Sequence, residues 1–206
     1  MRYGVFLRPD PPTCAAVTRI TAQLRAQYGL VSAGAFPPHA TLAGSLPVAA
    51  GEPALVHALD HALTGVVAFP VRNGGLGRLG PPSLVYDIHE LDGGPNPALV
   101  GLAATVGAAV GPLVTEATGL PADLYTPGRW RAHLSLASHD LWDRPELRDE
   151  VEDYVRGLAI DVPSSFTADT VALYALEHPS WTGAWWREMR WEHRRSWRLT
   201  TGRVEA

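Results

Sequence analysis

The chain has 206 residues, of which 46% are hydrophobic and 18% charged, and its formal net charge is −4. These values are typical of one globular domain or two small lobes, and they argue against a disordered chain or a protein that coats long nucleic acid. Cys14 is the only cysteine, so no internal disulfide can form and a reducing, cytoplasmic setting is favoured. No apolar run approaches the roughly 20 residues that span a bilayer, and the first residues lack the apolar segment of a signal peptide, so we expect no membrane contact.

Hydrophobic periodicity and turn residues divide the chain into extended and helical segments. The first is a strand over Tyr3–Leu7. Thr13 is expected to cap a helix that runs to about Tyr28 and stops at Gly29. Further helices are expected over 53–63, 97–118 and 145–157, and further strands over 39–42, 66–71, 83–88, 129–138, 169–177 and about 186–199.

The order of these elements is roughly βα, βα, ββ, α, β, α, ββ, without regular βαβ units. It predicts an α+β fold in which antiparallel sheet is covered by helices on one face. Two H-x-[S/T]-L segments follow similar surroundings about 94 residues apart. We interpret them as a degenerate internal duplication, so that residues 1–206 form a single bilobal domain with one H-x-[S/T] motif per lobe.

The two motifs place an imidazole and a hydroxyl on the same face of each strand. Side chains alternate between the faces of a strand, so His39 shares a face with Thr41, and His133 shares a face with Ser135, roughly 7 Å apart along the strand. The leucine and alanine positions between them then point into a core. If the two strands lie side by side, these four side chains converge on one small space.

This set of groups suits the cleavage of a phosphodiester. The attacking oxygen must lose a proton and the leaving oxygen must gain one, and one neutral and one protonated histidine perform both transfers near neutral pH. The hydroxyls of Thr41 and Ser135 can donate hydrogen bonds to the non-bridging phosphate oxygens. We therefore expect neither a metal nor a cofactor. Two unrelated strand histidines are the alternative, because short motifs also arise by chance.

Several segments together resemble the two-histidine phosphoesterase superfamily, also called LigT-like, over most of the chain. They are Tyr3–Leu7, Pro38–Leu42, Phe69–Val71 running to Gly75–Gly77, His133–Leu136 and Val171–Tyr174. The resemblance implies two antiparallel sheets with outer helices around a central cleft, related by a pseudo-twofold axis. It also implies His39 and His133 as the catalytic pair. Ala132 departs from the family, where proline often precedes the second histidine.

The resemblance implies a metal-independent phosphodiesterase that opens a cyclic phosphate. The substrate would be a 2',3'-cyclic nucleotide, an RNA end or ADP-ribose 1'',2''-cyclic phosphate. Two alternatives stay open: a 2'-5' RNA ligase, which runs the reverse chemistry, and a nucleotide-binding module without significant turnover. The segment Ala43–Ser45 replaces a bulkier stretch of the ligase-type members. The expected partner is a nucleotide or RNA-end substrate, and the oligomeric state is left open.

Other residues have two interpretations. Arg131 shares the face of His133 and would contact phosphate or lie on the surface. Tyr86 would face the substrate, although packing in the core is the preferred interpretation. His57 and His61 have the i, i+4 spacing of metal ligands, but a solvated helix face is favoured because no third ligand is evident.

The remaining features are interpreted as structural. The glycine-rich stretch 73–80 is expected to be a turn between strands, because it does not match a phosphate-binding loop. The segment 181–203 holds five of the seven tryptophans and six arginines, a mixture that can bind nucleic acid but that we interpret as an edge strand with Trp191 and Trp197 in the core. Cys14 is expected to be a buried small residue.

Overall fold

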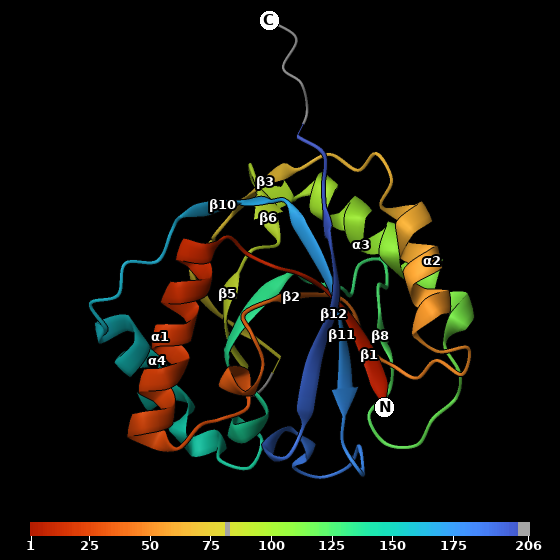
Figure 1. The fold of residues 1–206 in the computed structure, drawn as a ribbon. Helices are drawn as coiled ribbons and strands as arrows, with labels where there is room; N and C mark the ends of the chain where they lie inside the picture. Colours follow the sequence, from red (N-terminus) through yellow and green to blue (C-terminus); the bar gives the residue numbers. More distant parts are fainter. Residues whose placement is uncertain (81–82, 202–206) are drawn as a thin grey trace, which may run out of the picture.

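The computed structural model describes residues 1–80 and 83–201. Its largest sheet has five antiparallel strands in the order β12-β11-β1-β2-β8 (Figure 1). Their bounds are β1 Arg2–Leu7, β2 Ala40–Leu46, β8 Asp123–Leu124, β11 Thr170–Glu177 and β12 Arg190–Arg198. The first H-x-[S/T] motif therefore leads into an inner strand of this sheet.

The second motif lies in a different sheet. This three-stranded antiparallel sheet has the order β4-β5-β9 and contains β4 Leu76–Leu79, β5 Ser83–Asp87 and β9 His133–Ala137. Two strand pairs complete the described part of the chain: β3 Phe69–Arg72 with β10 Ser165–Ala168, and β6 Glu90–Leu91 with β7 Gly94–Pro95. The fold is thus α+β with antiparallel sheets, as the sequence predicted.

Two pairs of α-helices flank the sheets (Figure 1). Helices α1 Pro11–Tyr28 and α4 Arg148–Gly157 lie on one side, where the rings of Tyr28 and Tyr154 meet edge to face with centroids 5.4 Å apart. Helices α2 Glu52–Ala62 and α3 Pro97–Val110 lie on the other side. Short 3₁₀ turns are η1 Ala33–Ala35, η2 Gly111–Leu113, η3 His139–Leu141, η4 Pro145–Leu147 and η5 Trp185–Arg187.

Helix α1 shows how local sequence sets an element. Asp10, not the expected Thr13, is its N-cap: the Asp10 carboxylate accepts a hydrogen bond from the backbone N–H of Thr13 at 3.0 Å. A carboxylate satisfies an otherwise unpaired N–H of the first turn and interacts favourably with the helix dipole. Gly29 ends the helix with φ of 70°, a left-handed conformation that glycine adopts without steric cost.

Four further expectations need correction. Helix α3 ends at Val110 rather than near 118, since Pro112 has no N–H to donate to the preceding turn. The glycine-rich stretch contains strand β4, paired with β5, and is not only a turn. Strand β3 begins at Phe69 rather than 66. Strands β6, β7, β8 and β10 were missed because they have only two to four residues, too few to show a hydrophobic period.

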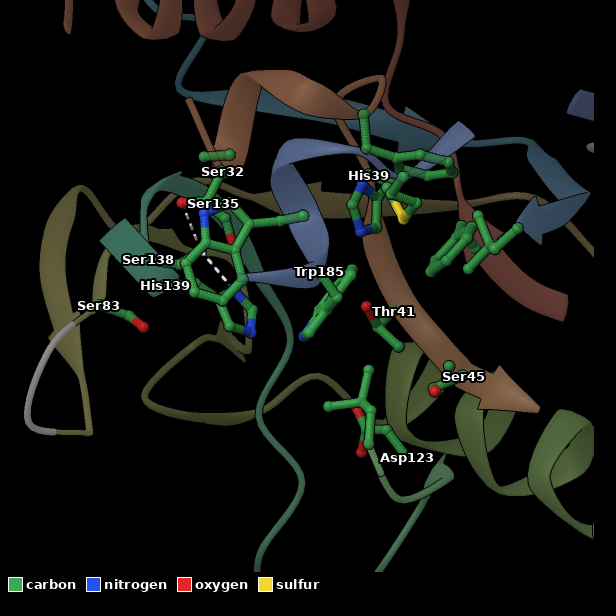
Figure 2. Close-up of a pocket in the computed structure, with 18 of the residues that line it drawn as sticks. Ser32, His39, Thr41, Ser45, Ser83, Asp123, Ser135, Ser138, His139 and Trp185 are labelled. Carbon is green, nitrogen blue, oxygen red and sulfur yellow. Dashed lines mark hydrogen bonds between the residues drawn. The ribbon is translucent and has the colours of Figure 1, made fainter. Parts of the chain in front are cut away.

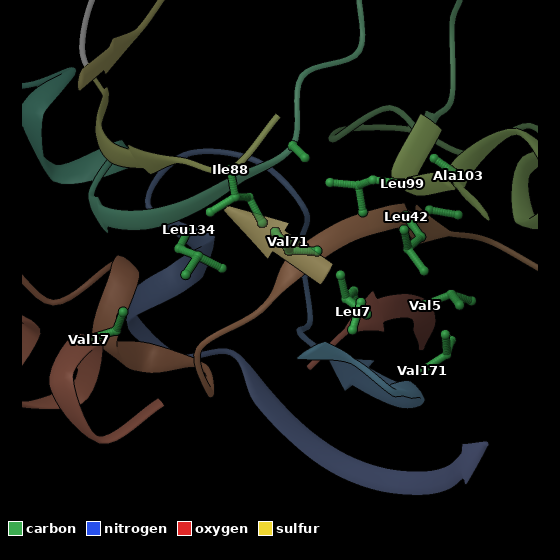
Figure 3. Close-up of a cluster of buried hydrophobic side chains, with 14 of the residues drawn as sticks. Val5, Leu7, Val17, Leu42, Val71, Ile88, Leu99, Ala103, Leu134 and Val171 are labelled. Carbon is green, nitrogen blue, oxygen red and sulfur yellow. The ribbon is translucent and has the colours of Figure 1, made fainter. Parts of the chain in front are cut away.

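One continuous cluster of buried apolar side chains joins the elements that carry both motifs (Figure 3). Leu42 of β2 and Leu134 of β9 are both in it, each 1% exposed or less. Val5 and Leu7 of β1 join them from the neighbouring strand. The leucines of the two motifs therefore point into the same core, on the opposite face of each strand from the histidine and hydroxyl side chains.

Candidate active site

His39 immediately precedes strand β2 and is positioned by its backbone and by aromatic rings. Its Nδ1–H donates a hydrogen bond to the carbonyl oxygen of Pro37 at 2.8 Å. The imidazole packs edge to face against Phe6 and Phe36, with ring centroids 4.4 and 4.8 Å away. Because Nδ1 is engaged, Nε2 is the ring nitrogen that remains available for chemistry.

His133 is the first residue of β9 and is held by the same kind of contact. Its Nδ1–H donates to the carbonyl oxygen of Arg131 at 2.9 Å, so Nε2 is again the available nitrogen. In the ladder between β5 and β9, His133 lies opposite Asp87. Each of the two histidines is thus bound to the carbonyl of the residue two positions before it, so the two imidazoles are oriented by the same local contact.

The two motifs meet across one cavity (Figure 2). Its volume is about 300 Å³, and His39, Thr41, His133 and Ser135 all line it. Strands β2 and β9 are not hydrogen-bonded neighbours in a sheet, so the four side chains face one another from two sheets rather than from adjacent strands. Figure 2 shows His39 and Thr41 along β2, with Ser135 on the other side of the cavity.

The two imidazoles differ in their electrostatic surroundings. Burial lowers the pKa of His39 to about 4, an effect that the proximity of His133 reinforces and the hydrogen bond to Pro37 partly offsets. Burial also lowers the pKa of His133; the hydrogen bond to the Arg131 carbonyl and then the carboxylates of Asp123 and Asp87 partly offset this and favour its protonated form. His39 therefore contacts two aromatic rings, whereas His133 has two carboxylates in its electrostatic surroundings.

Asp123 is a cavity residue that the sequence analysis missed. Strand β8 pairs with β2, with Asp123 opposite Gly44, and this pairing brings the carboxyl group into the cavity. The side chain stays exposed to solvent, but the protein around it still raises the pKa of its carboxyl group, whereas His133 lowers it. A two-residue strand has no periodic pattern, so no signal in the sequence distinguished Asp123 from other loop carboxylates.

Two of the proposed substrate contacts lie elsewhere. Arg131 does not line the cavity; its guanidinium forms ion pairs with Asp87 at 2.7 Å and Glu90 at 3.4 Å. Arg131 precedes the first ladder residue of β9, so strand alternation does not govern its direction. Tyr86 is 9% exposed and packs in the main core, opposite Leu134. The structure therefore supports the packing interpretation for Tyr86 and the surface interpretation for Arg131.

Comparison with family models gives a match over most of the chain. The model of the 2'-5' RNA ligase superfamily matches residues 9–179, a segment that contains both histidines. The chain belongs to this superfamily. The superfamily also includes the LigT-like, two-histidine proteins that the sequence motifs resemble. The comparison with curated proteins gave no match.

Solved structures of other proteins share the fold. TT0787 of Thermus thermophilus is 16% identical, with a TM-score of 0.58 over 98% of this chain and 99% of that one. E. coli LigT complexed with ATP is 15% identical, with a TM-score of 0.55 over 97% of this chain and 98% of that one. The complex of E. coli LigT with 3'-AMP has the same TM-score and 17% identity. At these identities the likeness establishes the α+β fold.

In the present protein, one wall of the cavity is formed by aromatic rings and hydroxyl groups. Trp185 and His139 lie on it, with ring centroids 5.1 Å apart (Figure 2). The hydroxyl of Ser138 is hydrogen-bonded to Nδ1 of His139 at 3.2 Å. The remaining hydroxyl side chains that line the cavity come from Ser32, Ser45 and Ser83. The wall thus offers flat rings and neutral hydrogen-bonding groups.

A buried arginine, Arg2, connects several of the segments that line the cavity. Arg2 is 2% exposed, and its guanidinium donates hydrogen bonds to the carbonyl oxygens of Thr118, at 2.8 Å, and of Leu120. It also donates to the hydroxyl of Ser45 at 2.6 Å and lies 4.9 Å from the ring centroid of Trp181. Ser45, Leu120 and Trp181 all line the cavity, so Arg2 connects three of its segments.

The remaining expectations concern residues away from the cavity. His57 and His61 are exposed, as a solvated helix face requires. Trp191 was expected in the core but is 43% exposed, whereas Trp197 packs against the core as expected. The register of β12 on β11 determines which of the two side chains faces the core. Cys14 is partly buried, and burial raises the pKa of its thiol, which disfavours a nucleophilic thiolate.

Metal-binding clusters and membrane-spanning helices are both absent from the described residues. Within residues 1–80 and 83–201, no cluster of three or more histidine, cysteine or carboxylate side chains has the arrangement of a metal site. No helix in the same residues has the length and apolar character needed to cross a membrane.

Proposed function

We propose that this protein is a metal-independent phosphodiesterase that opens the cyclic phosphate of a nucleotide, an RNA end or ADP-ribose 1'',2''-cyclic phosphate. The observation that carries the proposal is the matched anchoring of His39 and His133 across one cavity. With both Nδ1–H groups bound to carbonyls, each imidazole uses Nε2 either to accept or to donate a proton. The pair can therefore activate a water molecule and protonate a leaving oxygen.

The surroundings of the two rings assign their roles in this proposal. His39 is the base, because its apolar, aromatic surroundings favour the neutral imidazole. His133 is the acid, because the carboxylates of Asp123 and Asp87 favour its imidazolium. These assignments hold for ring opening, whether water or the 5'-hydroxyl of a second RNA is the attacking group, because in both cases the attacking oxygen loses a proton and the leaving ring oxygen gains one.

The proposed step balances in protons and bonds. Nε2 of His39 accepts a proton from water while the water oxygen forms a bond to phosphorus. The bond from phosphorus to the 2' or 3' oxygen breaks, and that oxygen takes the proton from Nε2 of His133. Thr41 and Ser135 hydrogen-bond the non-bridging oxygens, where charge concentrates in the transition state. Proton exchange with solvent then returns both histidines to their starting states.

The charge of the cavity supports a diester as substrate. Among the residues that the structure describes, no arginine or lysine lines the cavity, whereas Asp123 does. A cyclic phosphodiester carries one negative charge, but the phosphomonoester formed on ring opening approaches two near neutral pH. The cavity should therefore bind the diester better than the product, which favours release of the product.

A substrate panel in the presence of EDTA tests the proposal. It contains 2',3'-cyclic nucleotides, RNA with a 2',3'-cyclic phosphate end, ADP-ribose 1'',2''-cyclic phosphate and 5'-hydroxyl RNA as a ligation acceptor. We expect hydrolysis of at least one cyclic phosphate in EDTA, and loss of that activity in both His39→Ala and His133→Ala. Activity that disappears in EDTA and returns with zinc or manganese would contradict the metal-independent mechanism. Binding without any turnover would favour the nucleotide-binding module, and net joining of RNA would favour the ligase.

A further inference from the structure

A second concave surface lies on the other side of one cavity wall. This groove has a volume of about 550 Å³ and lies between helix α1, the segment 30–35 and the η5 turn. It shares Trp186 and Met189 with the cavity that contains the two histidines. The groove and the cavity are therefore neighbours with a common wall, to which Trp186 and Met189 belong.

The groove carries the positive charge that the cavity lacks. Arg25 of α1 and Arg187 of η5 both line it, and both are exposed to solvent. In the described part of the chain, no carboxylate lines the groove, and neither arginine takes part in an ion pair. By contrast, Arg194, Arg195 and Arg198 of β12 are all paired with carboxylates.

A buried carboxylate holds the shared wall in place. Asp140 is 4% exposed and accepts hydrogen bonds from the backbone N–H groups of Val31, at 2.7 Å, and Ser32, at 2.5 Å. Its other oxygen accepts from the indole N–H of Trp186 at 3.3 Å. Ser32 and His139, next to these groups in the chain, line the cavity (Figure 2). The three hydrogen bonds connect the segment 30–35 to the η5 turn. They therefore hold in place the turn that carries Arg187.

We propose that the groove binds phosphate groups of the substrate other than the one that reacts. Guanidinium groups bind phosphate oxygens through paired, charge-assisted hydrogen bonds, and two arginines without acidic partners are available here. The substrate is then a nucleotide with at least one further phosphate, such as an RNA end, rather than a nucleoside cyclic phosphate. This inference rests on the proposed function in one respect: the phosphate that reacts in the cavity is taken to be a cyclic phosphate.

The test separates binding in the groove from turnover in the cavity. The probes are a nucleoside 3'-phosphate, its 5'-phosphorylated form, and di- and trinucleotides with a 3'-phosphate, whose dissociation constants are measured by calorimetry. We expect affinity to rise by about tenfold or more along the series, the scale of one good charge-assisted contact. In Arg25→Gln/Arg187→Gln this gain should disappear, while affinity for the nucleoside 3'-phosphate stays unchanged.

Arg19→Gln/Arg190→Gln is the matched control, because it removes the same two charges at exposed positions outside the groove, one of them on helix α1. It should keep the full gain. The same series with 2',3'-cyclic ends should show the same pattern in KM if the proposed function is right. Equal affinity for all lengths in the wild type, or a gain that survives the double substitution, would overturn the groove assignment. Absence of turnover with the gain intact would instead refute only the proposed reaction.

Discussion

His39 and His133 are anchored in the same way, each by an Nδ1–H hydrogen bond to a backbone carbonyl two residues earlier, at 2.8 and 2.9 Å. Neither anchor depends on a second side chain, so each motif carries its own orienting group. The motifs come from different sheets, and the cavity between them brings the two imidazoles to the same space. Two short backbone anchors therefore leave both Nε2 atoms free to exchange protons with a substrate.

Removal of either imidazole should disable the reaction. We expect His39→Ala and His133→Ala each to lower kcat by about 10²–10⁴-fold, the usual scale for general acid–base catalysis. The double variant should lose much less than the product of the two single losses, because the pair acts as a unit. His57→Ala, at an exposed helix position, is the control and should retain full activity. Near-full turnover by either single variant in a steady-state assay would disprove the two-histidine mechanism.

Loss of a cavity hydroxyl should have a smaller effect. Thr41→Val and Ser135→Ala each remove one neutral donor to a phosphate oxygen and leave the proton transfers intact. We expect a loss of about tenfold in kcat/KM, equivalent to about 1.4 kcal/mol. Thr126→Val, at an exposed position outside the cavity, serves as the control. If either hydroxyl variant fell as far as the histidine variants, the proposed division of roles would be wrong.

The pH profile of kcat/KM should reflect the unequal surroundings of the two histidines. The base is neutral above the His39 pKa of about 4, and the acid is protonated below the pKa of His133, which burial lowers from 6.5. The optimum for the free enzyme is therefore expected between about pH 4 and 6.5, more acidic than two unperturbed histidines would give.

Asp123→Asn provides a sharper test of the same profile. The Asp123 carboxylate favours the imidazolium of His133, so its removal should move the alkaline limb to lower pH and leave the acid limb in place. Asp153→Asn, exposed on α4, changes the net charge equally and should move neither limb. If Asp123→Asn moved the acid limb instead, the roles of the two histidines would be reversed.

His39 should also make the fold sensitive to acid. Its folded-state pKa of about 4 lies below the ordinary value of 6.5, so between these pH values the unfolded chain binds more protons. The contribution to stability is fully present above pH 6.5 and is lost as the pH falls toward 4, by up to about 3 kcal/mol. Urea unfolding at pH 7 and 4.5 should show a smaller pH effect in His39→Gln than in the wild type. An unchanged pH effect would contradict the burial of a neutral imidazole.

Asp140 should be important for the wall between the cavity and the groove. Asp140→Ala leaves the three N–H donors of Val31, Ser32 and Trp186 without their acceptor. We expect a loss of about 2–4 kcal/mol in the free energy of unfolding, measured by denaturant titration. Asp143→Ala, at an exposed position nearby, should change stability by less than about 0.5 kcal/mol. A wild-type unfolding midpoint in Asp140→Ala would show that the carboxylate is dispensable.

Local patterns in the sequence determined most of the longer elements, the α+β class and the residues most suited to chemistry. Alternation in the two H-x-[S/T]-L segments placed their leucines in the core and their histidines opposite, because the faces of a strand depend only on a two-residue period. Gly29 marked the end of α1 for an equally local reason, its access to positive φ. Arg131 shows the limit of this reasoning, since it lies outside the regular strand.

Only the tertiary structure decided what surrounds the two histidines. Asp123 reaches the cavity through a two-residue pairing of β8 with β2, a contact between segments about 80 residues apart that no local pattern encodes. The rings of Phe6 and Phe36 meet His39 from β1 and from the end of η1, and they lower its pKa by excluding water. Protonation depends on the charges and the solvent within a few ångströms of a group, and those neighbours come from distant parts of the chain. The sequence therefore identified the two histidines, and folding gave them different proton affinities.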